Sequence, residues 1–160
     1  MILSTHAIVG GAIASVFPSH PFTAVAAAFA SHFAIDAIPH WDYPLRSITS
    51  GPKARNNLRL GGARLRDVSL IGFDALAGVA LAVYFFATPA TVALVSLGAL
   101  AAMLPDPLQF VHSLYPRGPL NLLQRFHSWM HTNCTLDWPI GISSQIAFAS
   151  AVIGITAGLR

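Results

Sequence analysis

The stretch ALAGVALAVYFFATPATVALVSLGALAAMLP, residues 75–105, decides the fold class because it contains no charged residue. A hydrocarbon core about 30 Å thick needs about 20 apolar helical residues for one crossing. Apolar residues begin earlier, at Val68, and Thr88-Pro89 is a turn signal inside the run. We therefore predict two membrane helices, 68–87 and 90–104. Residues 138–159 also lack charge and predict a further span, 139–159.

The composition of the chain supports a membrane protein and excludes several other classes. Only 9% of the 160 residues are charged and 54% are hydrophobic, whereas about a quarter of a soluble domain is charged. One cysteine, Cys134, excludes a disulfide scaffold. The net charge of +3 does not indicate a nucleic-acid partner, because six of the nine Lys/Arg fall between Arg46 and Arg66. Such a cluster is typical of one cytoplasmic membrane loop.

The remaining apolar runs complete an all-α fold. Residues 2–17 and 22–38 predict a helical hairpin, with a turn at 18–21 and a stop at Pro39. The expected fold is a single polytopic bundle of about five transmembrane helices, 2–17, 22–38, 68–87, 90–104 and 139–159. Residues 108–114 and 120–130 are too short to span and predict interfacial or re-entrant helices. Loops 40–67 and 105–138 hold eight of the nine basic residues, which predicts that these loops and the N-terminus are cytoplasmic.

Histidine and aspartate recur at helical spacing near this predicted cytoplasmic side. His32 and Asp36 are four residues apart, and His127 and His131 repeat the spacing, so each pair shares one helix face. The predicted topology brings other polar side chains to the same depth, namely His6, Asp74 and Asp106. An ionised Asp in hydrocarbon costs several kcal/mol, so a cation, a proton or a water-filled cavity must accompany it.

Imidazole and carboxylate together form the ligand set of zinc or another first-row divalent metal such as manganese. We predict one to three ions held by His6, His32, Asp36, Asp106, His127 and His131. Asp74 is expected to be a further ligand or the general base. His40 and Asp42 stay open between metal ligands and loop residues beside the interfacial aromatics Trp41 and Tyr43.

Two motifs carry a family resemblance. Thr5-His6-Ala7-Ile8-Val9-Gly10-Gly11 and Ser31-His32-Phe33-Ala34-Ile35-Asp36-Ala37-Ile38-Pro39-His40-Trp41-Asp42 resemble the small inner-membrane proteins known as membrane-bound metal-dependent hydrolases. More distantly, they resemble the zinc-dependent phospholipase C and single-strand nuclease group. The second resemblance implies that His32, Asp36 and His40 bind metal. The family's His-Arg-x-x-Thr-His-Ser signature is altered here, because His127 and His131 are four apart and Arg125 precedes them.

The resulting expectation is a metal-dependent hydrolase of the prokaryotic inner membrane that cleaves a phosphoester of a lipid or other amphipathic substrate. Arg125, Arg64 and Arg66 are candidates to bind the phosphate. One alternative is a metal-ion or proton carrier that uses the same residues, with Asp74 as the relay. Another is a metal-stabilised membrane scaffold without catalysis. The outer turns, 18–21 and 88–89, offer no polar path from the ligand layer, which favours the enzyme over the carrier.

Overall fold

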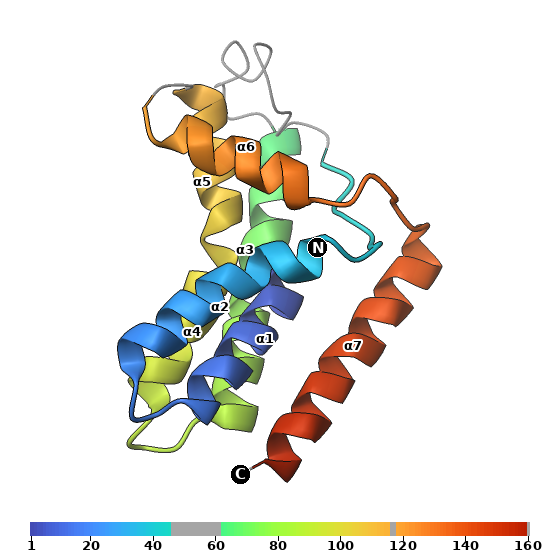
Figure 1. Cartoon of the computed structure of the whole chain (residues 1–160). Coiled ribbons are helices and arrows are strands. Elements are labelled where there is room, and N and C mark those ends of the chain that lie inside the picture. The colour runs from blue at the N-terminus through green and yellow to red at the C-terminus, as the bar shows by residue number, and fades with distance from the viewer. Residues whose placement is uncertain (46–61, 116–117, 160) are drawn as a thin grey trace.

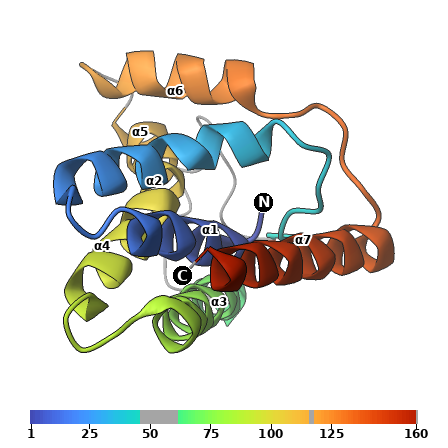
Figure 2. The same ribbon diagram turned by 60° about the horizontal axis from the view of Figure 1, so that its bottom comes forward.

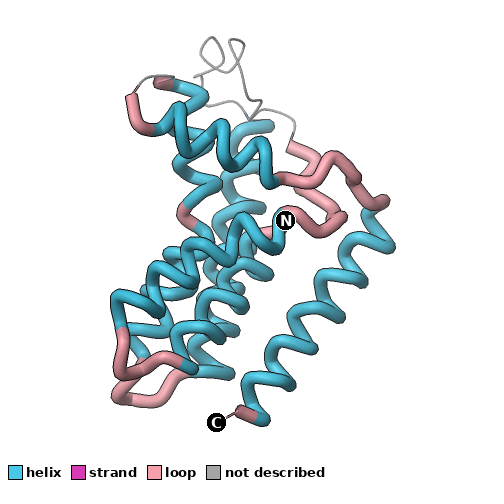
Figure 3. Tube along the Cα trace, viewed as in Figure 1, coloured by secondary structure: helices cyan, strands magenta, loops and turns pink. Residues whose placement is uncertain are grey.

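A computed structural model of the chain describes residues 1–45, 62–115 and 118–159, with the side chains of 62–64 and 114 left out. These residues form seven α-helices and no β-strand, which confirms the all-α prediction (Figures 1 and 3). The helices are α1 (Leu3–Val16), α2 (Pro21–Asp36), α3 (Gly62–Phe86), α4 (Val92–Met103), α5 (Pro105–Leu114), α6 (Leu120–Met130) and α7 (Trp138–Gly158).

Prolines mark three helix starts, as their sequence positions suggest. Pro21 begins α2, Pro105 begins α5 and Pro139 lies in the first turn of α7, where a missing N–H costs no helical hydrogen bond. The prediction that the loop 40–67 extends to residue 67 is wrong, because α3 already begins at Gly62. Backbone hydrogen bonds within an α-helix form regardless of side-chain polarity, so α3 can begin before its apolar residues do. Residues 46–61, with most of the basic cluster, lie outside the described part of the chain.

The number of membrane spans is smaller than the five predicted. Only α3 and α7 are individually long and apolar enough to cross a membrane, among the residues that the structure describes. A third span is possible if α4 and α5, bent by 40° at their junction, count as one. The other apolar helices are short: α1 has 14 residues and α2 has 16, about 21 and 24 Å long.

Helix α1 lies at the centre of the bundle. It packs against α2, α3, α4 and α7, and it is buried on nearly all sides (Figure 2). Its closest neighbour is α4, where Gly10 and Gly98 face each other. A Cβ added to Gly10 would lie 2.3 Å from the carbonyl oxygen of Gly98, so this contact requires glycine. Small residues of this kind let two helix backbones approach closely.

One end of the bundle gathers the polar elements. The N-terminus of α1 and the last turn of α2 lie there, and α6 crosses over them (Figure 1). The segments that follow α2 and α6 are paired: Thr132 N–H donates to the Asp36 carbonyl at 2.9 Å, and Leu136 N–H donates to the His40 carbonyl at 3.0 Å. A parallel β-bridge joins His40 and Thr135. This pairing brings residues 36–42 and 127–136 together, although they are about 90 positions apart.

Candidate metal centre

The histidines and aspartates that predict a metal site meet at this polar end. All eight belong to one continuous network of short contacts, with the Asp36 carboxylate at its centre. The members come from α1 (His6), α2 (His32 and Asp36), the segment after α2 (His40 and Asp42), the start of α5 (Asp106), α6 (His127) and its end (His131).

Three ligand atoms form a nearly equilateral triangle around one side of Asp36. The Nε2 atoms of His32 and His127 are 3.3 Å apart, and they lie 3.2 and 3.3 Å from Asp36 Oδ2. In a tetrahedral zinc site with bonds of about 2.0–2.1 Å, neighbouring ligand atoms are about 3.3 Å apart. The triangle therefore has the dimensions of one face of such a site. Its three residues are buried, with at most 2% of each exposed.

Asp106 supplies a fourth ligand position at the rim of the triangle. Its Oδ1 lies 3.6 Å from His32 Nε2, and its side chain is 32% exposed. The four residues His32, Asp36, Asp106 and His127 each offer a ligand atom within 4.8 Å of the others and could hold a metal ion. Because the fourth residue is the exposed one, the side of the cluster that faces α5 is the accessible side.

Backbone carbonyls orient the imidazoles for this role. The Nδ1 atom of His32 lies 2.9 Å from the Ala102 carbonyl oxygen. Likewise, Nδ1 of His40 lies 2.7 Å from the Ile38 carbonyl, and Nδ1 of His131 lies 2.9 Å from the Thr132 carbonyl. Each Nδ1 therefore carries a proton, and Nε2 is the ring nitrogen that faces the carboxylates. The same arrangement orients histidine ligands in metal sites.

The second oxygen of Asp36 faces another group of histidines. Its Oδ1 lies 3.1 Å from His6 Nε2 and 3.9 Å from His40 Nε2. Both nitrogens are buried, and neither forms a well-oriented hydrogen bond to any described residue. Asp36, His40 and His131 form a second group that could hold a metal ion. A second ion could therefore take ligands from Asp36, His40 and His131, whereas His6 contacts the same carboxylate but belongs to neither group.

Asp42 and the amino group of Met1 lie beside this second group but do not belong to it. The Met1 ammonium lies 2.9 Å from Asp36 Oδ1 and 2.9 Å from Asp42 Oδ1. Asp42 also lies 3.1 Å from His40 Nε2 and 3.7 Å from His131 Nε2. Burial raises the pKa of Asp42, but contact with His40 and the Met1 ammonium outweighs it and lowers the pKa below its usual range. Burial lowers the pKa of His40, and the neighbouring Asp42 carboxylate reverses this and raises it.

Asp74, on α3, contacts the first turn of α1 and belongs to neither of the two groups that could hold a metal. Its Oδ2 accepts hydrogen bonds from the Ser4 backbone N–H at 2.9 Å and from the Tyr43 hydroxyl. The Tyr43 hydroxyl in turn accepts the Leu3 N–H at 2.8 Å. A helix N-terminus leaves its first N–H groups without partners, and here Asp74 and Tyr43 provide them. This role of Tyr43 was not predicted, because Trp41 and Tyr43 together resemble an interfacial aromatic belt.

Replacing Asp74 by alanine is therefore expected to weaken the fold more than the metal site. The variant would leave the Ser4 N–H unpaired, which costs about 1–3 kcal/mol of unfolding free energy. Metal content of purified protein should stay close to that of the parent. Asp137→Ala, at an exposed carboxylate, is the control for loss of charge. Loss of metal from Asp74→Ala, without loss from Asp137→Ala, would instead make Asp74 a ligand.

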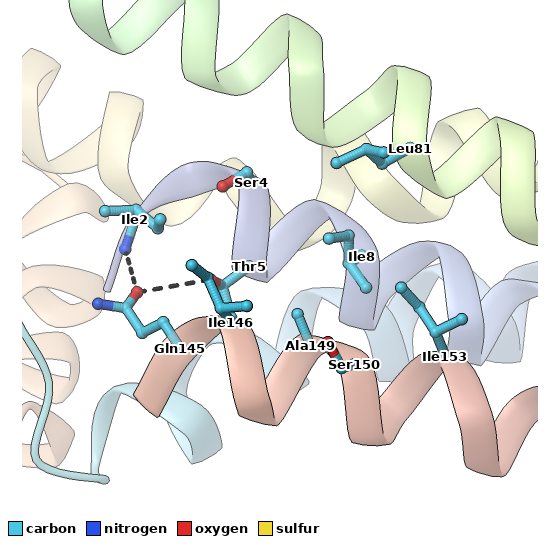
Figure 4. A pocket seen from close by; sticks show the side chains of 10 residues that line it. All are labelled: Ile2, Ser4, Thr5, Ile8, Leu81, Gln145, Ile146, Ala149, Ser150 and Ile153. Atoms are coloured by element: carbon cyan, nitrogen blue, oxygen red, sulfur yellow. Dashed lines mark hydrogen bonds between the residues drawn. The ribbon is translucent and has the colours of Figure 1, made fainter. Parts of the chain in front are cut away.

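Gln145 is a second residue whose role near the site was not predicted. Its Oε1 accepts the Ile2 N–H at 3.0 Å and lies 3.4 Å from Thr5 Oγ1 (Figure 4). Its Nε2 donates to the carbonyl of Trp41 at 2.9 Å. It thereby joins α7 to the start of α1 and to the His40–Asp42 segment. A buried glutamine in an otherwise apolar span is the sequence signal that could have identified it. Beside Gln145 lies a cavity of about 220 Å³ that is lined by residues of α1, α3 and α7.

Arg66 and Arg125, the two predicted phosphate-binding arginines whose side chains are described, are not part of the His/Asp network. Arg125 is exposed on α6 and lines a groove of about 410 Å³ with His112, Asn121, Gln124 and Ser128. Arg66 is exposed near the start of α3. The side chain of Arg64 lies outside the described residues.

Comparison with family models, with curated proteins and with solved structures finds no match to this chain.

Proposed function

We propose that this protein is a membrane-embedded, metal-dependent hydrolase that cleaves a phosphoester of an amphipathic substrate at the membrane interface. The observation that carries the proposal is the triangle formed by His32, Asp36 and His127, completed by a partly exposed Asp106. A catalytic metal site needs ligands held rigidly on one side and an accessible position on the other. The resemblance of the Ser31–Asp42 stretch to metal-dependent hydrolases supports the same reaction class.

The residues of the His/Asp network would have distinct roles in this reaction. His32 and His127 would hold the first ion with Asp36, and His40 and His131 would face the position for a second. Zinc, or another first-row divalent ion, would lower the pKa of a bound water and polarise a phosphoryl oxygen. Asp42 is the carboxylate beside this second position, because its side chain contacts both His40 and His131 and would hold the two imidazoles in place.

The structure supports an enzyme more than a carrier. A carrier needs a polar route from the metal centre to the opposite end of the bundle. Among the described residues, the interior beyond His6 and His32 is an apolar core formed by Ile8, Ala12, Val95 and Ala99. A non-catalytic scaffold would need a closed ligand shell, whereas Asp106 lies at an accessible edge.

The test is phosphate release from lipid substrates by protein reconstituted in bilayers. We expect a metal-loaded preparation to release phosphate or a phosphorylated head group from a phospholipid or a polyprenyl phosphate. Chelation should abolish the activity, and a divalent ion should restore it. Asp42→Asn should lower turnover, because it weakens the contacts that hold His40 and His131, while leaving the ion at His32, Asp36 and His127 in place. Movement of metal or protons across sealed vesicles without any lipid product would favour the carrier and contradict the proposal.

We further propose that the protein resides in a prokaryotic inner membrane with its metal centre and N-terminus at the cytoplasmic face. The exposed thiol of Cys134 provides a test, because it follows α6 at the same end as the centre. In intact cells an impermeant maleimide should leave Cys134 unlabelled, and in inverted vesicles it should label it. The control is S19C in a C134S background, which places a thiol in the exposed turn at the opposite end and should show the reverse pattern.

A further inference from the structure

Helix α6 exposes an apolar stripe that none of the other described residues covers. Leu122 is 75% exposed, Phe126 is 42% exposed and Trp129 is 76% exposed. The three residues are separated by four and three positions, so they share one helix face. Three large apolar side chains on one face of an 11-residue helix indicate contact with a lipid or protein surface.

The other faces of α6 differ sharply from this stripe. One face directs His127 inward, where the residue is 2% exposed and contacts Asp36. Another carries only polar residues, including Arg125 and Ser128, which line the 410 Å³ groove beside α5. A short helix with one apolar face, one polar face and an arginine is typical of a segment that lies in the plane of a membrane surface.

Aromatic ring contacts join the apolar stripe of α6 to α2. Ring centroids of Phe29 and Phe33 on α2 are 5.6 Å apart, Phe33 and Phe126 are 4.9 Å apart, and Phe126 and Trp129 are 6.0 Å apart. Figures 1 and 2 both show α6 beside the end of α2 that carries the metal-centre residues. The outer face of α2 is itself apolar, with Phe22 91% exposed. Phe33 is buried, so these contacts fix Phe126 against α2, and the exposed stripe itself consists of Leu122, Phe126 and Trp129.

We propose that α6 is an interfacial helix that inserts Leu122, Phe126 and Trp129 among the lipid chains at the membrane surface. Its polar face, with Arg125, then lies toward the phosphates of the head groups. Tryptophan is enriched at this depth in membrane proteins. A second copy of the chain fits less well, because a stable interface buries about 800 Å² per partner and three side chains cannot supply that area.

This inference does not depend on hydrolysis or on metal binding, but it has a consequence for the centre. The helix that contacts the membrane with one face presents His127 to the cluster with another. Membrane insertion of α6 would therefore set the depth of the metal centre at the level of the lipid head groups.

The test uses Trp129 as the only tryptophan, in a Trp41→Phe/Trp138→Phe background. The protein is reconstituted in phosphatidylcholine vesicles that contain bromine either near the head groups or near the bilayer centre. We expect strong quenching of Trp129 emission by the shallow bromines and weaker quenching by the deep ones. The absence of quenching at every depth would overturn the proposal, as would strongest quenching at the bilayer centre.

A second measurement keeps the test independent of these aromatic substitutions. Spin labels are attached to L122C and, as the matched control on the polar face, to S128C, both in a C134S background. The label at position 122 should respond mainly to oxygen, which concentrates in lipid, and the label at position 128 mainly to a water-soluble nickel complex. Equal responses of the two labels to nickel would contradict insertion. Protection of position 122 from both reagents, together with twice the monomer mass, would show that a second copy covers this face and would also overturn the proposal.

Discussion

Purified Asp36→Asn protein is expected to lose most of its bound divalent metal, which should amount to about one to three ions per parent chain. Asp36 contacts His32 and His127 through Oδ2, and His6 and His40 through Oδ1, so its charge serves both groups. Asparagine has one carbonyl oxygen and no charge, and it cannot serve both. The free energy of unfolding should also fall by about 3–5 kcal/mol, because the substitution breaks the buried ion pair with the Met1 ammonium and removes the carboxylate that four imidazoles contact.

Elemental analysis of the purified protein and denaturation in micelles measure the two effects. His32→Ala should lower metal content in the same way, because its Nε2 belongs to the triangle. His20→Ala is the matched control, since His20 is exposed in the turn at the opposite end of the bundle. A parent protein that is stable and metal-free without chelators would refute the metal centre, and so would equal metal loss in His20→Ala.

Gly98→Leu is expected to lower the stability of the fold more than any other single substitution considered for the helix packing. A Cβ at this position would lie 2.5 Å from the Ala14 Cβ and 2.6 Å from the Gly10 carbonyl oxygen. Backbone cannot move aside as a flexible side chain can, so α1 and α4 must separate. We expect the free energy of unfolding to fall by about 3 kcal/mol or more. Metal affinity should fall with it, because α1 carries His6 and α4 orients His32 through the Ala102 carbonyl.

The control for this substitution is Gly154→Leu on α7. A Cβ at Gly154 meets no described atom within 4 Å. Leucine has a higher helix propensity than glycine by up to about 1 kcal/mol, so this variant should be neutral or slightly stabilised. A similar loss of stability in both variants would mean that the contact between Gly10 and Gly98 does not determine the packing of α1.

Helix positions and several members of the His/Asp network were predictable from local sequence patterns, for a physical reason. Residues four apart on a helix share a face, so the pair His32/Asp36 and the pair His127/His131 each specified neighbours without knowledge of the fold. Proline and polar turns ended the apolar runs near the observed helix ends. Depth in the membrane then brought His6 and Asp106 to the same layer.

The partners of Asp74 and the number of spans were not predictable in this way. Depth along a bundle says nothing about rotation around a helix axis, so Asp74 lies at the expected level but faces the start of α1. Hydropathy likewise does not distinguish a helix surrounded by lipid from one surrounded by other helices. For this reason α1 resembles a span in sequence, whereas in the structure it is an enclosed central helix.

The sharing of one Asp36 carboxylate by two groups of histidines has a consequence for how ions and substrates would bind. Two ions that share a single bridging charge compete for it, so the first should bind more tightly than the second and a metal titration should show two separate steps. Only three carboxylates, Asp36, Asp42 and Asp106, belong to the network among the described residues. Two divalent ions would exceed their combined charge and leave the occupied centre positive. An anionic phosphate would then be attracted to it without a dedicated arginine.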